Sequence, residues 1–138
     1  MAIHFIENLA TVHVDGARSG GAFALVELWG PEGDMPPLHV HHREDETFYV
    51  LEGRITFHAG PETVELAAGD CFLAPRDVPH TYRVESDGAR WLVVGSPAGF
   101  DAFVREVGEI RPFDPARMGE TAARYGIEIL GPPGTLPA

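Results

Sequence analysis

The chain has 138 residues, enough for one domain of ordinary size and too few for two. Twenty-one acidic residues against ten basic ones give a net charge of −11. This balance disfavours a nucleic-acid or anionic-membrane partner, because both attract clustered Lys and Arg. No apolar run approaches the roughly 18 residues needed to cross a bilayer, and residues 1–20 lack the apolar core of a signal peptide. The single cysteine, Cys71, leaves no internal disulfide, so we expect a cytoplasmic protein.

Glycines and prolines divide the first hundred residues into short β-prone runs. Two of the intervening turns are Asp15-Gly16 and Glu52-Gly53-Arg54, and the second predicts a tight hairpin. Many short strands at regular spacing are typical of an all-β sandwich or barrel. The expected strands cover residues 9–14, 22–29, 38–41, 47–51, 55–58, 63–66, 70–74, 80–84 and 91–94.

The pattern becomes helical after Pro97. Phe100–Val107 carries apolar residues at i, i+3, i+4 and i+7, which predicts an amphipathic helix. Asp114-Pro115 is typical of an N-cap followed by proline at the first helical position, and it opens a second helix that Gly126 would end. We therefore expect a single domain over 1–138, with a barrel core at about 9–96 and a helical segment at about 98–126.

A pattern of histidines and a carboxylate stands out within the expected barrel: Gly33-x5-His39-x-His41-x4-Glu46-x6-Gly53. If residues 38–42 are extended, His39 and His41 point to the same face of the sheet. Glu46 returns on the next strand, and His80 supplies a third imidazole later in the chain. Three histidines and one glutamate that converge on one point describe a mononuclear metal site with open positions.

These residues resemble the cupin family. Residues 33–53 match its first motif without a departure, and the second motif is similar to Gly69-x5-Pro75-x-Asp77-x2-His80. Asp77 stands where that motif usually has glycine, and aspartate tolerates a left-handed or tight-turn backbone better than most residues. Val84 stands where the motif usually has asparagine, which is not usually a metal ligand.

The resemblance implies a conical cupin β-barrel, a double-stranded β-helix or jelly roll, with a metal near its wider mouth and two short C-terminal helices. The ligands carried over by position are His39, His41, Glu46 and His80. Glu44 and Asp45 compete with Glu46 as the carboxylate, and the spacing selects Glu46. His42 should face away from His41. His4, His13 and His58 lack partner spacing and are expected at the surface or in packing.

The donor set suits one divalent transition metal ion: Fe, Mn, Ni, Co, Cu or Zn. Four protein donors on a six-coordinate ion leave two positions for substrate oxygen atoms and for O2 or water. Glu46 is also the candidate catalytic residue, because a weakly held carboxylate can accept a substrate proton.

Alternation places Phe48 on the face of Glu46 and Tyr82 on the face of His80, which makes both candidates for the substrate pocket. The competing interpretation is that a small barrel simply fills its interior with large apolar side chains. Which residues of strand 22–29 face inward stays open. Phe100 and Phe103 can cover the barrel mouth or make an ordinary helix–sheet contact. Cys71 is expected to be a small buried hydrophobe and not a nucleophile.

The run from Asp45 to Gly53 looks like that of the quercetin-dioxygenase-like subgroup of cupins. The resemblance implies a dioxygenase that binds a flavonol or similar small enol through oxygen, with Glu46 as the base. Two alternatives stay open: a non-oxidative metal enzyme (isomerase, decarboxylase or lyase) and a non-enzymatic module that binds a small molecule. Edge strands need protection, so we also expect a homodimer.

Overall fold

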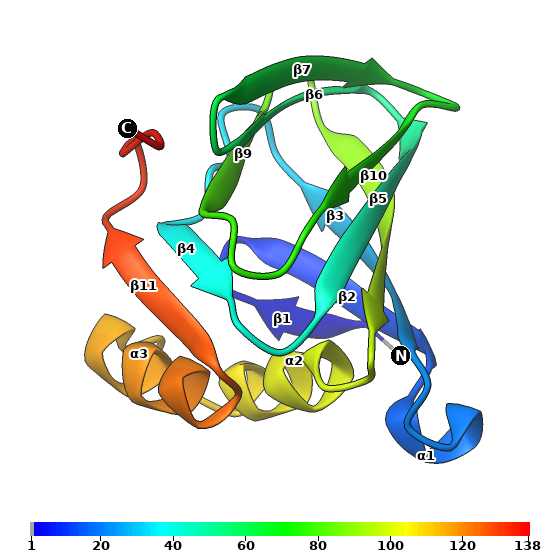
Figure 1. The fold of residues 1–138 in the computed structure, drawn as a ribbon, viewed down its shortest axis with the longest axis vertical. Coiled ribbons are helices and arrows are strands. Elements are labelled where there is room, and N and C mark those ends of the chain that lie inside the picture. Colours follow the sequence, from blue (N-terminus) through cyan, green and yellow to red (C-terminus); the bar gives the residue numbers. More distant parts are fainter. Residues whose placement is uncertain (1) are drawn as a thin grey trace.

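The strands form two antiparallel sheets that enclose one core. Along the strands, residues that are buried in this core alternate with more exposed ones. The computed structural model describes residues 2–138. Figure 1 shows the sheets wrapped around a common interior, with the helices below them. The six-stranded sheet contains, in spatial order, β1 (Ile3–Phe5), β2 (Asn8–Val14), β3 (Ala24–Gly30), β10 (Ala89–Ser96), β5 (Asp45–Glu52) and β8 (Cys71–Ala74). The expected all-β barrel of jelly-roll type is confirmed.

The second sheet contributes the strands that carry the histidines. It contains, in spatial order, β11 (Ile127–Gly131), β4 (Leu38–His41), β9 (His80–Val84), β6 (Arg54–Ala59) and β7 (Glu62–Ala67). The strands predicted at 38–41 and 80–84 have the observed bounds, and most of the others are longer by one or two residues at one or both ends. The strands predicted at 22–29 and 70–74 begin one or two residues later than expected. β1 and β11 were not predicted, because three to five residues beside turns carry little periodicity.

The inward side chains of both sheets form one apolar core. Trp91, Phe57 and Ile55 are almost completely buried in it. The face of strand β3 is now settled: its inward residues are Ala24, Val26 and Leu28. Trp29, of the other parity, is 41% exposed on the outer face. The interior of this small barrel is therefore filled mainly by apolar side chains, as expected.

The predicted hairpin at Gly53 is wrong. β5 pairs with β10 and β8, whereas β6 pairs with β7 and β9, so the two strands belong to different sheets. Both edges of β5 are occupied, and a hairpin partner has no free edge to join. Gly53 instead makes a corner with φ of 86°, where a Cβ would lie 2.6 Å from the carbonyl oxygen of Gly88. This close approach and the positive φ explain the glycine.

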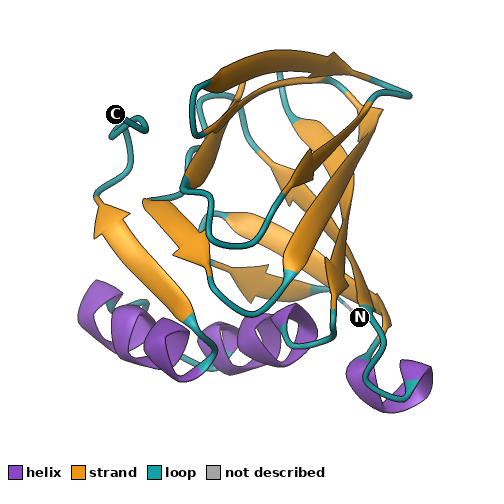
Figure 2. Cartoon of the chain, in the orientation of Figure 1, coloured by secondary structure: helices purple, strands orange, loops and turns teal. Residues whose placement is uncertain are grey.

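Two of the helices match the prediction. α2 (Phe100–Gly108) buries its apolar stripe, and α3 (Pro115–Arg124) begins after Asp114, whose side chain accepts a hydrogen bond from Ala116 N. Gly126 follows with φ of 73°. A third helix, α1 (Gly16–Ser19), stands where a turn was expected, and Asp15 caps it. Figure 2 shows α2 and α3 lying along one end of the sheets. No helix among residues 2–138 is long and apolar enough to span a membrane.

The expected burial of Cys71 is also wrong. Its side chain is exposed, because Cys71 begins the edge strand β8 and lies opposite the exposed Tyr49 on the outer face of the sheet. The neighbouring parity, Phe72 and Ala74, turns inward. Composition alone favours burial of a free cysteine, and the register of the edge strand overrides that preference here.

Candidate metal centre

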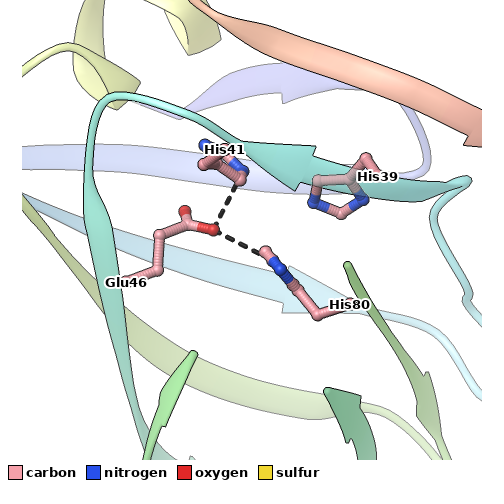
Figure 3. Close-up of side chains that lie close together, drawn as sticks. All are labelled: His39, His41, Glu46 and His80. Carbon is pink, nitrogen blue, oxygen red and sulfur yellow. Dashed lines mark hydrogen bonds and ion pairs between the residues drawn. The ribbon is translucent and has the colours of Figure 1, made fainter. Parts of the chain in front are cut away.

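Three strands, two from one sheet and one from the other, bring the candidate ligands together. His39 and His41 lie on β4, and His80 begins β9 directly opposite His39 in the β4–β9 pair. Glu46 lies near the start of β5, in the other sheet. Figure 3 shows all four side chains turned toward a common point between the sheets. The alternation argument thus places the two histidines of β4 on one face.

The donor atoms of this cluster are close enough to hold one ion. One ligand atom from each residue lies within 4.8 Å of the others. Glu46 Oε1 is 2.9 Å from His41 Nε2 and 3.2 Å from His80 Nε2. The rings of His39 and His80 are 4.4 Å apart between centroids. His41, Glu46 and His80 are buried and His39 is half-buried, so the cluster faces a sheltered space.

The other ring nitrogen of each histidine is occupied. His39 Nδ1 is 2.6 Å from Pro37 O, and His80 Nδ1 is 3.3 Å from Val78 O. Because a carbonyl oxygen can only accept, both Nδ1 atoms must carry the proton and donate. This fixes the tautomer in which Nε2 offers a lone pair to the centre, the usual arrangement for histidines that bind a metal.

Glu44 orients the third histidine, His41. The sequence suggested Glu44 only as a competing metal ligand and not in this orienting role. Its carboxylate is buried, and Oε1 accepts from His41 Nδ1 at 2.6 Å. A Cβ on Gly99, just before α2, would lie 3.1 Å from Glu44 Oε2, so the glycine leaves room for this carboxylate. The i, i+3 spacing from His41 was a usable signal, because a second carboxylate beside a ligand is a common orienting group.

The charges of the cluster balance one another. Burial works against a charged His41 ring, but Glu46 and Glu44 outweigh it and raise the pKa of His41 to about 10. Burial also opposes ionisation of Glu46, yet His41 and His80 hold its pKa well below the usual range. The pKa of His39 is lowered by burial and by the two neighbouring histidines. The cluster therefore holds an ionised Glu46 carboxylate and a neutral His39 imidazole, and a bound cation would take the place of the proton on His41.

The rejected candidates lie outside the centre. His42 is exposed, and its ring nitrogens lie 2.7 Å from Asp77 Oδ1 and 3.0 Å from Glu128 Oε1. Asp45 points outward and pairs with Arg76. Asp77 adopts φ of 67°, the left-handed conformation expected for a residue that replaces glycine. His4 and His13 are exposed and His58 is half-buried, in agreement with the sequence.

A cavity extends from the four donors into the barrel. Phe48 and Tyr82 line it, as do Phe100 and Phe103, which also belong to the core. Its lining is largely apolar, and its volume is about 60 Å³. An engineered cavity of about 150 Å³ accommodates benzene. In this conformation, the cavity therefore suits a slender ligand, and a wider one requires side chains to move.

The donor set fits a divalent transition metal. Imidazole nitrogen and carboxylate oxygen suit Fe, Mn, Ni, Co, Cu and Zn alike. Three histidines whose Nδ1 atoms are tied back and one carboxylate leave open positions that face the cavity. The arrangement can thus hold an ion and present it to a small molecule.

Comparison with known proteins identifies similar chains. The family described as "Cupin domain" matches residues 25–95. The quercetin 2,3-dioxygenase of Bacillus subtilis (strain 168) is 35% identical over 118 residues, which cover 82% of this chain and 35% of that protein. The Aspergillus japonicus enzyme of the same name is 32% identical over 96 residues, 64% of this chain and 27% of that one. The chain thus spans about a third of the length of these relatives or less.

Solved structures share the fold. KdgF from Halomonas sp. superimposes with a TM-score of 0.63 at 21% identity, over 70% of this chain and 86% of that one. At this identity the likeness concerns the arrangement of the strands alone.

Proposed function

The chain belongs to the cupin domain family, and from this premise we propose that it is a metal-dependent dioxygenase acting on a small enolic substrate. The observation that carries the proposal is the convergence of the ligand atoms. Three imidazoles and the Glu46 carboxylate meet in a buried space, and all three Nδ1 atoms are held by acceptors. Preorganisation of this kind is what a metal site requires.

His39, His41, Glu46 and His80 would hold the ion. When bound, a divalent transition metal supplies Lewis acidity or a path for electrons. Glu46 accepts the proton of the enol hydroxyl, because it is the carboxylate that lines the cavity beside the three histidines. Glu44 fixes the orientation of His41, and the apolar walls at Phe48 and Phe100 keep water away from the substrate.

The choice of oxygen chemistry is supported by the two quercetin dioxygenases to which the chain is similar. The choice of a compact enol, and not a full flavonol, is supported by the cavity of about 60 Å³. The same small volume favours one alternative, a non-oxidative lyase or isomerase in which Glu46 moves a proton within a small substrate.

The test begins with metal analysis by plasma mass spectrometry on untagged protein. We expect about one equivalent of a transition metal in the wild type, and its loss in His80→Ala. The matched control is His42→Ala, which removes an exposed histidine beside the centre and should keep the metal.

O2 uptake by the loaded protein then separates the two chemistries. We expect consumption with small enols, and less with flavonols. No metal in the wild type, even after reconstitution, would refute the proposal. A bound metal without O2 uptake would contradict the dioxygenase and favour the non-oxidative lyase or isomerase.

A further inference from the structure

A second polar cluster lies in the same cavity, away from the metal ligands. Asn8, Asp34 and Tyr82 all line the cavity, and all three are buried. Asn8 Nδ2 donates to Asp34 Oδ2 at 2.6 Å. The hydroxyl of Tyr82 lies 3.5 Å from Asn8 Oδ1, a long contact that leaves it able to bind a better partner. Buried polar side chains in an otherwise apolar cavity are the usual means of orienting a ligand.

The fold holds this cluster in place. Asp34 follows Gly33 in the loop between β3 and β4, and its carbonyl oxygen accepts from Val84 N at 3.0 Å. A Cβ on Gly30 would lie 2.6 Å from Asp34 Oδ2 and 2.9 Å from Asn8 Nδ2. The end of β3 therefore has space for the Asn8–Asp34 pair only because residue 30 is glycine.

The cluster is separated from the metal ligands along the cavity wall. Tyr82 lies two residues after His80 on β9, and both face inward. Two residues of a strand span about 7 Å. The ring of Tyr82 packs against Trp91, with 5.2 Å between the ring centroids. A ligand that reaches both clusters must therefore be elongated.

The electrostatics of this end differ from those of the metal centre. Burial raises the pKa of Asp34, against the hydrogen bond from Asn8. No cationic side chain lines the cavity at this end within the described residues 2–138. The Tyr82 hydroxyl is thus a hydrogen-bond donor and Asp34 is an acceptor, and no cation at this end pairs with an anionic ligand.

We propose that Asn8, Asp34 and Tyr82 form a recognition site for a hydroxyl group at the end of the ligand opposite its metal-binding oxygen atoms. The inference rests on the proposed function, because His39, His41, Glu46 and His80 must hold a metal that binds the near end. The ligand class is a slender, uncharged molecule with oxygen at both ends. Its far hydroxyl donates to Asp34 and accepts from Tyr82. A far carboxylate is disfavoured, because no cation lines this end of the cavity to pair with it.

The test uses aliphatic hydroxamates as probes, since a hydroxamate chelates zinc and zinc is redox-inert. Each probe has two to four methylene groups and ends in a hydroxyl, a methyl or a carboxylate. Affinity for the zinc-loaded protein is measured by calorimetry. At the best chain length, we expect the hydroxyl-ended probe to bind about tenfold tighter than its methyl counterpart. The carboxylate-ended probe should bind more weakly than both.

Single-residue variants test which side chains cause the preference for the hydroxyl-ended probe. Tyr82→Phe and Asp34→Asn should each remove most of the preference for the hydroxyl, and Asp34→Asn should also improve binding of the carboxylate-ended probe. Glu32→Gln, an exposed carboxylate two residues before Asp34, should leave the wild-type pattern unchanged.

Equal affinity for hydroxyl and methyl ends at every chain length in the wild type would overturn the inference. So would a preference that survives in both variants, or failure of every probe to bind the zinc-loaded protein. Failure of the protein to bind zinc at all is a separate result, and it would refute the proposed function on which the inference rests. The wild-type comparison among the three end groups needs no variant to fold.

Discussion

The two ends of the cavity are built in different ways. At the end with the candidate metal ligands, called the metal end below, three of the four donors lie within eight residues, from His39 to Glu46. At the far end, Asn8, Asp34 and Tyr82 come from three distant segments, 26 and 74 residues apart along the chain. The first end is charged and balanced by its own histidines, whereas the second holds one carboxylate without a cation. A short spacing motif reveals the first kind of site, and only the folded chain reveals the second.

The largest expected effect is a loss of metal affinity, and it should arise from a change at the metal end alone. Glu46→Gln removes the carboxylate that lies 2.9 Å from His41 Nε2, so we expect metal affinity to fall by about 100-fold or more. Asp45→Asn is the matched control, because Asp45 points outward toward Arg76 and should keep the wild-type affinity. Calorimetric titration with zinc measures both. Equal losses in the two variants would show that the spacing argument selects the wrong carboxylate.

A smaller effect on metal affinity is expected from Glu44, which contacts a candidate ligand but is not itself one of the four donors. Glu44→Gln weakens the bond to His41 Nδ1 and leaves all four donors in place, so metal affinity should fall by about 10-fold to 100-fold. Competition with a chromophoric chelator measures the change. An unchanged affinity would mean that Glu44 serves only the fold.

The packing at the far end can be disrupted without changing any of the four candidate metal ligands. Gly30→Ala pushes a methyl group against Asp34 and Asn8, and we expect a loss of about 1–3 kcal/mol in the free energy of unfolding. Zinc affinity should not change. Gly119→Ala is the control, since a Cβ on this helical glycine meets no atom within 4 Å, and it should stabilise by up to about 1 kcal/mol. Urea unfolding compares the three proteins, and a stable Gly30→Ala protein would contradict the close packing.

The smallest effect is a pH dependence. Because the pKa of Asp34 is raised in the folded protein, the folded state binds this proton more readily than the unfolded chain. Its contribution to stability is present at low pH and is lost as pH rises from the ordinary value of 3.8 through the folded pKa. Asp34→Asn should therefore gain stability relative to the wild type between about pH 4 and about pH 7. Urea midpoints at both pH values measure this, and a constant difference would contradict it.

The sequence predicted the strand geometry of the candidate metal centre better than the rest of the fold, for physical reasons. Strand alternation and spacing placed His39, His41 and Glu46 on inward faces, because these depend on local geometry. The corner at Gly53 was misjudged, since pairing between β5, β10 and β8 depends on partners far away in the chain.

Two further residues illustrate the same limit. Glu44 was weighed only as a competing ligand, and its contact with His41 Nδ1 depends on how the loop folds back. No pattern in the sequence singled out Asp34, because its proposed role depends on Asn8 and Tyr82, which only the fold brings near it.

The pairing of β11 with β4 has a practical consequence for anyone who handles this protein. Ile129 lies opposite His39 and Ile127 opposite His41, so the carboxyl-terminal strand forms the outer neighbour of the strand that carries two candidate ligands (Figure 1). A fragment trimmed to residues 25–95 would keep the histidines but expose the backbone of β4 to other chains. Expression vectors should therefore encode the sequence through β11, and affinity tags belong at the amino terminus, away from this seam.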